Sequence, residues 1–288
     1  MDIAVLADIH GNYIALDRCI KYAEERGIDT FLFLGDYVGE LAYPEKTLDM
    51  LYGMKKKYNC VFIRGNKEGY WIDYRNREDK TWEWTDYNST TGMLRYAYDR
   101  LSDKDIDFFE VLPMKQRIEF EGHPPFLICH GSPYQVNEKM IPNSDRIFEI
   151  LEASETGLII CGHTHWQNKT IYNKKAALNP GSVGMPLLSE GRTQFLILSS
   201  HERGWQEEFI SLEYEVDEVI ADMRKDKLMV HAPYWSYVAE RVLRNGRISN
   251  AQVLDRAMAL CKEAVGECVW PHIPEKYWEQ AIRELYAE

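Results

Sequence analysis

The sequence opens with Met1-Asp2-Ile3-Ala4-Val5-Leu6-Ala7-Asp8-Ile9-His10-Gly11-Asn12, in which a short apolar run leads into a polar turn. The apolar run predicts a buried strand, and Gly11 permits a tight turn behind it. Residues 13–26 have apolar side chains at helical spacing and are followed by Gly27, so they predict an amphipathic helix. A buried strand followed by a helix is the first part of a βαβ unit.

The same alternation continues along the first third of the chain. Residues 30–34 and 60–64 read as buried strands, and residues 44–57 between them read as a helix that begins at Pro44. Such units predict a largely parallel sheet with right-handed crossovers.

Later strands have fewer helices between them. They are expected at 116–120, 126–129, 158–161, 176–178, 195–198 and about 206–212, with one helix near 144–153. We therefore expect a second, more antiparallel sheet packed face to face on the first. The predicted fold is α/β, a four-layer αββα sandwich of two mixed β-sheets with a C-terminal helical extension.

Two other regions differ from this pattern. Residues 70–111 are rich in aromatic and charged side chains and predict a mostly helical insertion in a main domain of residues 1–213. Residues 214–288 lose the strand signal and predict helices at 216–225, 234–244, 250–264 and 275–286. This extension carries no chemical signature; it could roof a site, cover the sheet or form the interface of a homo-oligomer.

Composition narrows the class of protein. The 288 residues are 45% hydrophobic and 28% charged, as in an ordinary globular protein, and the formal net charge of −12 disfavours nonspecific nucleic-acid binding. No apolar run approaches the roughly 20 residues that span a bilayer, and the N-terminus lacks the basic region of a signal peptide. Six scattered cysteines without a Cys-x-x-Cys pair favour a reducing compartment, so we expect a cytoplasmic location.

Aspartate, asparagine and histidine residues follow several of the predicted strands. Because loops at the carboxyl ends of strands gather at one sheet edge, we expect these side chains to meet. The residues are Asp8, His10, Asp36, Asn66, His130, His163 and His165. Carboxylate, imidazole and amide oxygen together suit Mn, Fe or Zn ions better than Ca²⁺. A single histidine would more often be an ordinary core residue, but the ordered set predicts a pair of metal ions that share a bridging carboxylate.

In this order the motifs resemble those of the calcineurin-like metallophosphoesterase superfamily, and in particular its small prokaryotic branch. The resemblance covers about residues 1–200. The matching motifs are Asp8-Ile9-His10, Gly35-Asp36, Gly65-Asn66-Lys67-Glu68, His130-Gly131 and Gly162-His163-Thr164-His165, together with Asn179-Pro180-Gly181-Ser182-Val183-Gly184.

The resemblance implies two sets of ligands for two divalent or trivalent metal ions. The first ion would be bound by Asp8, His10, Asp36 and His165, and the second by Asp36, Asn66, His130 and His163. A metal-bridging hydroxide would then attack phosphorus. Both ions, helped by Asn12, Arg64 or Lys67, would balance the charge on the phosphoryl oxygens.

Lys67 departs from the family pattern, which often has histidine after Gly-Asn to protonate the leaving oxygen. An amine with a reference pKa of about 10.4 is a poor acid at neutral pH unless nearby cations lower its pKa. Lys67 therefore either donates a proton to the leaving group or acts on the substrate as a fixed positive charge. Alternatively, it only pairs with Glu68 or with neighbours of Asp8. A fixed charge favours good leaving groups, such as those of nucleotide phosphoanhydrides.

The aromatic segment and the function both leave alternatives open. Tyr70, Trp71, Trp82 and Trp84 could stack on a base, although aromatic residues at helical spacing more often pack in a core. We expect a metal-dependent phosphoric ester hydrolase that acts on a small phosphorylated substrate such as a nucleotide. Its activity could resemble that of a dinucleoside tetraphosphatase. The alternatives are a serine/threonine protein phosphatase, although Gly-Asp-x-x-Asp-Arg-Gly is not found at Gly35, and a non-catalytic scaffold that binds a partner.

Overall fold

A computed structural model describes residues 1–202 and 204–287 of the chain. Its first sheet has five strands in the order β10-β9-β1-β2-β3. The strands are β1 (Asp2–Leu6), β2 (Thr30–Phe33), β3 (Asn59–Phe62), β9 (Thr193–His201) and β10 (Gly204–Leu212). The first three are parallel to one another, whereas β9 is antiparallel to β1 and β10 is antiparallel to β9.

The second sheet also has five strands, in the order β4-β5-β6-β8-β7. These are β4 (Lys115–Ile118), β5 (Phe126–Cys129), β6 (Leu158–Cys161), β7 (Asn168–Tyr172) and β8 (Lys175–Asn179). The central strands β5, β6 and β8 are parallel, and the two edge strands are antiparallel to their neighbours.

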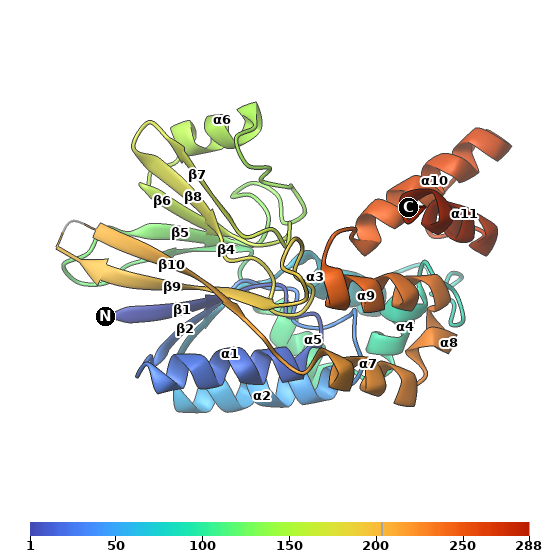
Figure 1. Cartoon of the computed structure of the whole chain (residues 1–288), viewed down its shortest axis with the longest axis horizontal. Helices are drawn as coiled ribbons and strands as arrows, with labels where there is room; N and C mark the ends of the chain where they lie inside the picture. Colours follow the sequence, from blue (N-terminus) through green and yellow to red (C-terminus); the bar gives the residue numbers. More distant parts are fainter. Residues whose placement is uncertain (203, 288) are drawn as a thin grey trace.

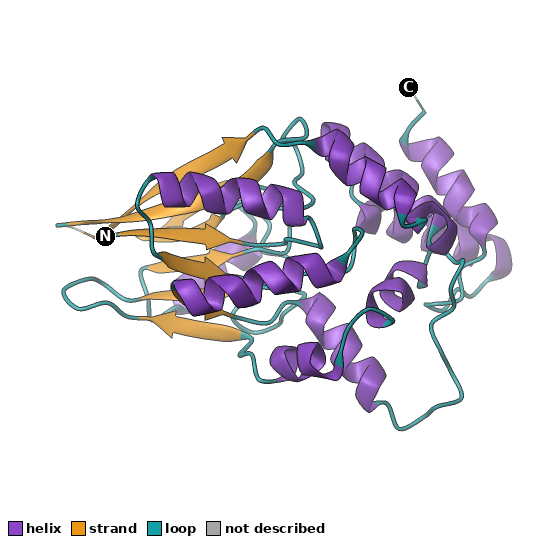
Figure 2. Ribbon diagram, turned by 90° about the horizontal axis from the view of Figure 1, so that it is seen from below, coloured by secondary structure: helices purple, strands orange, loops and turns teal. Residues whose placement is uncertain are grey.

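The two sheets pack face to face and are covered by helices on their outer faces, so the predicted four-layer fold class is confirmed (Figure 1). Val5 and Leu32 from the first sheet share one buried core with Ile128 and Ile160 from the second. On the outer face of the first sheet lie α1 (Tyr13–Glu25) and α2 (Pro44–Lys57), as Figure 2 shows from below. The outer face of the second sheet is covered by α6 (Asp145–Ala153).

The remaining helices gather at the end of the sandwich toward which β1 and β2 point (Figure 1). They include α3 (Asn66–Asn76), α4 (Gly92–Tyr98) and α5 (Asp103–Glu110) of the aromatic insertion. The extension contributes α7 (Val216–Lys225), α8 (Leu228–His231), α9 (Pro233–Asn245), α10 (Asn250–Val265) and α11 (Glu275–Leu285).

The extension shares a core with the main domain. Leu41, Met93 and Met185 lie in the same buried cluster as Trp235 and Trp278 of the extension. The boundary between residues 213 and 214 stays a prediction, because the apolar packing continues across it.

Three details of the sequence-based prediction were wrong. The second sheet is not mainly antiparallel, because β5, α6 and β6 form a parallel crossover unit, and β9 and β10 join the first sheet instead. The strand β7 was not predicted, since it is an edge strand in which only Thr170 is buried. The single-turn helix α8 was also not predicted.

Among the described residues, no helix combines the length and the apolar character that a membrane span requires. All six cysteines are free thiols.

Candidate metal centre

The predicted ligands meet because each follows the carboxyl end of a strand. Asp8, Asp36 and Asn66 follow β1, β2 and β3, while His130 follows β5 and His163 follows β6. The parallel arrangement of these strands brings five loops to one edge of the sandwich.

Most of these residues have an unusual backbone conformation. Asp8, His10, Asp36, His163 and His165 all have φ between 53° and 67°, the left-handed region that residues with a Cβ atom rarely adopt. Strained backbone of this kind is typical of functional sites, where the surrounding structure holds it in place. The backbone of these loops is therefore held in a strained conformation that directs the side chains toward the site.

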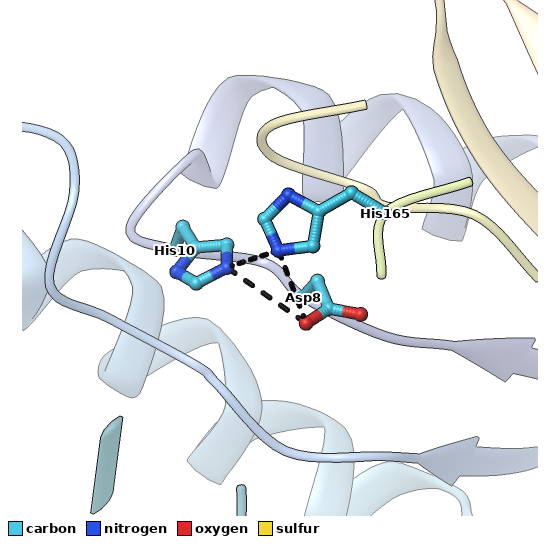
Figure 3. A group of neighbouring side chains, drawn as sticks. All are labelled: Asp8, His10 and His165. Atoms are coloured by element: carbon cyan, nitrogen blue, oxygen red, sulfur yellow. Dashed lines mark hydrogen bonds and ion pairs between the residues drawn. The ribbon is translucent and has the colours of Figure 1, made fainter. Parts of the chain in front are cut away.

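The first group of side chains is formed by Asp8, His10 and His165, which point toward one another (Figure 3). His10 Nε2 lies 2.9 Å from His165 Nε2, and Asp8 Oδ1 lies 3.3 Å from His165 Nε2 and 3.8 Å from His10 Nε2. Asp8 and His10 are buried.

A second group lies on the other side of Asp36. Asp36 Oδ1 is 3.5 Å from His130 Nε2, and Asp36 Oδ2 is 3.8 Å from His10 Nε2. The amide Oδ1 of Asn66 is 3.1 Å from the same His130 nitrogen. The two carboxylate oxygens of Asp36 thus face imidazoles of two different groups, which is the placement that a bridging ligand needs.

The backbone fixes the orientation of two imidazoles. His130 Nδ1 is 2.7 Å from Leu34 O, and His165 Nδ1 is 2.8 Å from Met185 O, so in each ring Nε2 is left to face the site. Histidines that bind metals commonly use their second nitrogen in this way. The ring of His163 lies 5.2 Å from that of His130 between centroids, and its backbone N–H donates to Asp8 Oδ2.

The histidines of the site differ in their pKa values. Burial, together with His165, lowers the pKa of His10 to about 4, and burial with His130 lowers the pKa of His163 to about 4. Burial also disfavours the charged form of His130, but the attraction of Asp36 outweighs it and raises the pKa of His130 to about 10. His10 and His163 are thus neutral at pH 7, whereas His130 is protonated and must release its proton to bind a metal ion.

The side chains fit a cation in two respects. Asp8 Oδ1 is fully buried and accepts no hydrogen bond, and a buried anionic oxygen of this kind is costly unless positive charge faces it. The close approach of His10 Nε2, His165 Nε2 and Asp8 Oδ1 gives three donor atoms for one ion. Imidazole, carboxylate and amide donors together suit Mn, Fe or Zn ions.

A sequence profile of the calcineurin-like phosphoesterase superfamily domain matches residues 1–203. The chain belongs to this family. The match includes every residue of the two groups described above, and so confirms the resemblance seen in the motifs.

Relatives of this chain extend the match beyond residue 203. An uncharacterized protein of Methanocaldococcus jannaschii is 25% identical over 252 residues, 81% of this chain and 94% of that protein. The fold is similar to the crystal structure of a hypothetical protein from Pyrococcus horikoshii OT3, with a TM-score of 0.71 and 20% identity over 85% of this chain and 98% of that chain. It is also similar to the crystal structure of a metallophosphoesterase from Sphaerobacter thermophilus, with a TM-score of 0.67 and 20% identity over 85% of this chain and 99% of that chain.

Two glycines allow the loops of the metallophosphoesterase centre to touch. A Cβ atom on Gly35 would lie 2.3 Å from Gly65 N, and one on Gly65 would lie 2.2 Å from Asp36 Oδ1. Glu68, which the sequence did not single out, joins the same loops, because its buried carboxylate accepts hydrogen bonds from the backbone N–H groups of Gly65, Asp36 and Tyr37. Its place in Gly65-Asn66-Lys67-Glu68, three residues after the N-cap Gly65 of α3, was the available signal.

Lys67 lies beside the centre in an ion pair with Glu40, and both side chains are buried. The suggested pairing of Lys67 with Glu68 or neighbours of Asp8 was wrong, because Glu68 binds backbone N–H groups instead. Burial alone would lower the pKa of Lys67, but Glu40 and Asp36 outweigh it and raise that pKa above its ordinary value. Glu40 also accepts a hydrogen bond from the indole N–H of Trp235, and so links the centre to the extension.

Asn12 and Arg64 lie in the loops that follow β1 and β3, and the side chain of Asn12 has partners outside the two groups. The Oδ1 of Asn12 caps α1 by accepting from Ala15 N, and its Nδ2 donates to Gly184 O and Tyr214 Oη. The backbone N–H of Arg64 donates to Pro113 O. Neither residue lines the cavity beside the centre, which includes His10, Asp36, Lys67 and His165.

The aromatic segment is divided between core and surface. Trp71 and Trp84 are buried, and Trp84 stacks on Tyr74 with ring centroids 4.0 Å apart. Trp82 packs edge-on against Tyr74 and is outside the cavity lining, whereas Tyr70 lies in that lining. Packing therefore accounts for Trp71 and Trp84.

Proposed function

We propose that the protein is a dinuclear metal-dependent phosphoesterase that hydrolyses a phosphoester or nucleotide phosphoanhydride in a small molecule. The observation that carries the proposal is the position of Asp36, whose two oxygens face His130 on one side and His10 on the other. A shared carboxylate between two sets of nitrogen and oxygen donors is the arrangement that holds paired metal ions.

We assign the ligands accordingly. Asp8, His10, Asp36 and His165 would hold one ion. Asp36, Asn66, His130 and His163 would hold the other. Mn, Fe and Zn ions all suit these donors, and when bound they supply the activated water and the positive charge that hydrolysis of a phosphoryl group requires.

Lys67 acts in this proposal as a fixed positive charge. Its ion pair with Glu40 favours the protonated amine, so Lys67 attracts phosphoryl oxygens and is a poor proton donor to a leaving group. Leaving groups that need little protonation, such as a nucleoside phosphate, fit this role better than simple alkoxides. A dinucleoside tetraphosphatase-like activity is one example of such chemistry.

The cavity beside the centre supports a small substrate over a phosphoprotein. It has a volume of about 720 Å³ and part of its wall comes from the C-terminal extension, including Trp235, Asn250 and Leu254. Pockets of about 300–1,000 Å³ enclose most of the surface of a small organic ligand. The extension therefore contributes part of the wall of the site. That it forms the interface of a homo-oligomer and that the protein is cytoplasmic both stay predictions.

A substrate panel with added Mn²⁺ tests the proposal. It contains mononucleotides, cyclic nucleotides, dinucleoside polyphosphates and phosphopeptides, each measured with wild type, His165→Ala and Asn66→Ala. We expect turnover of at least one small substrate that falls by about 100-fold or more in both variants. Preference for the phosphopeptide would favour a protein phosphatase. Equal rates in wild type and variants for every substrate would contradict the proposal and favour a scaffold.

A further inference from the structure

The cavity beside the metal centre is much larger than a phosphoryl group needs. Its lining includes His10, Asp36 and His163 of the centre and residues of the extension from Trp235 to Trp270. Its volume of about 720 Å³ leaves a wide space next to the place where phosphorus would lie. A ligand whose phosphate reaches the centre must therefore have its organic group in this space.

Aromatic side chains from distant parts of the chain gather around this space. Tyr70 follows the centre on α3, Trp166 follows β6, and Trp270 lies between α10 and α11. Their exposed fractions are 39%, 41% and 39%, so each presents a large apolar surface. Trp235 adds a fourth ring, which is held in place by its hydrogen bond to Glu40.

Exposed aromatic side chains of this kind are costly unless a ligand covers them. Apolar surface that gathers in a cavity and adjoins polar groups marks a ligand site. Planar rings bind well to such surfaces, since stacking on an aromatic side chain contributes about 1–3 kcal/mol per base. The aromatic walls thus favour a planar aromatic group, which can stack on them.

The charges of the lining are consistent with an anionic phosphoester that has a neutral organic group. Lys67 lies near the centre and is paired with Glu40, while Lys139 and Arg247 also lie in the lining. The positive groups of the lining favour an anionic ligand, and the aromatic walls accept the organic part of the molecule.

We propose that this cavity binds the organic group of the substrate and that this group is a planar aromatic ring system of the size of a nucleoside base. The inference rests on the proposed phosphoesterase function and deepens it, because it assigns the C-terminal extension a role in substrate specificity. Ala251 in the first turn of α10 is a specificity-determining position, since it is exposed and lies in the lining.

The test fills the cavity from the extension side with Ala251→Trp. Ala264→Trp is the matched control, because Ala264 is exposed on the same helix and lies outside the lining. Trp166→Ala is a second variant, which removes one exposed ring of the wall. Circular dichroism and thermal melts check that all three variants fold like the wild type.

Binding is measured by calorimetry on the Mn²⁺-loaded full chain with adenosine, 1-naphthol and ribose, none of which has a phosphoester bond to hydrolyse. We expect adenosine or 1-naphthol to bind and ribose not to bind. Ala251→Trp and Trp166→Ala should weaken binding by about tenfold, and Ala264→Trp should change it less than about twofold. Binding of adenosine alone identifies a nucleoside, and equal binding of 1-naphthol identifies a general aryl group.

Kinetics provide the second measurement, with a nucleoside 5′-monophosphate and ribose 5-phosphate, which share the same ester bond and differ by the base. If the enzyme hydrolyses these monoesters, Ala251→Trp should lower kcat/KM about tenfold for the nucleotide only. Absence of aromatic binding, or equal effects of Ala251→Trp and Ala264→Trp, would overturn the inference even in an active enzyme. Aromatic binding by a protein that hydrolyses nothing would overturn only the proposed function.

Discussion

Glu68 holds Asp36 in position through the backbone: its Oε2 accepts a hydrogen bond of 2.9 Å from Asp36 N. The same oxygen accepts from Gly65 N at 2.8 Å, and Oε1 accepts from Tyr37 N at 2.8 Å. One buried carboxylate therefore ties the loop after β2 to the loop after β3. The position of the candidate bridging ligand Asp36 thus depends on a residue outside the set of candidate ligands.

We predict that Glu68→Ala lowers the free energy of unfolding by at least about 3 kcal/mol. The substitution leaves three buried backbone N–H groups without an acceptor, and each such group costs about 1–3 kcal/mol. Urea denaturation in the presence of EDTA measures this effect separately from metal binding. Glu78→Ala is the control, since Glu78 is exposed and its loss should change the free energy by less than about 0.5 kcal/mol. Equal effects of the two substitutions would contradict the role of Glu68.

The strands that carry the candidate ligands could be predicted from sequence for a physical reason. Parallel strands buried on both faces are continuous apolar runs, so Phe126–Cys129 and Leu158–Cys161 have the bounds that their composition predicted. The polar residue after each run then marks the sheet edge. By contrast, β7 is an edge strand with alternating polar residues, and its sequence has no such signal.

Contacts between distant segments could not be predicted. Trp235 and Glu40 are 195 residues apart, and neither belongs to a motif. The position of β9 beside β1 is also a non-local pairing that local periodicity does not encode. Candidate metal ligands can be proposed from sequence because chemistry restricts their residue types, whereas the cavity walls are ordinary aromatic residues in three separate segments.

Gly65 and Gly69 offer a matched pair of substitutions four residues apart. Gly65→Ala would bring a Cβ atom to 2.2 Å from Asp36 Oδ1, whereas a Cβ on Gly69 meets no atom within 4 Å. We predict that Gly65→Ala weakens Mn²⁺ binding by about tenfold or more, because Asp36 must move. Gly69→Ala, in the interior of α3, should instead stabilise the protein by about 0.5–1 kcal/mol without changing Mn²⁺ affinity. Titration calorimetry and thermal melts measure the two effects, and unchanged affinity in Gly65→Ala would show that Asp36 is not held as proposed.

The ion pair of Lys67 and Glu40 should appear as coupling in a double-mutant cycle. Lys67→Met leaves Glu40 buried without its cation, which costs about 3 kcal/mol or more. We predict that Lys67→Met with Glu40→Gln destabilises the protein by about 2 kcal/mol less than the sum of the two single substitutions. Denaturant unfolding of the four proteins gives the coupling energy. Additive effects would mean that the two charges do not interact in solution.

If Lys67 also acts on the substrate, Lys67→Ala must lower turnover of the best substrate in the panel. Lys67→Arg keeps the positive charge and should retain more activity than Lys67→Ala. If Lys67 were a proton donor, Lys67→Arg would lose as much activity as Lys67→Ala, since arginine does not release its proton at neutral pH. Comparison of kcat for the two variants therefore separates a fixed charge from an acid, and unchanged turnover in Lys67→Ala would remove both roles.

Metal binding should stabilise the fold, because the ligands come from five separate loops and are brought together only in the folded chain. At a free Mn²⁺ concentration about 100-fold above its dissociation constant, the free energy of unfolding should rise by about 2.7 kcal/mol for one site. Thermal melts before and after removal of metal by EDTA measure the change. His165→Ala should reduce this increase, since His165 Nε2 lies 2.9 Å from His10 Nε2 in the first group. His201→Ala, at the exposed end of β9, should leave the increase unchanged. If Mn²⁺ raised the melting temperature of His165→Ala as much as that of the wild type, the stabilisation would come from another site, and the assignment of His165 as a ligand would be wrong.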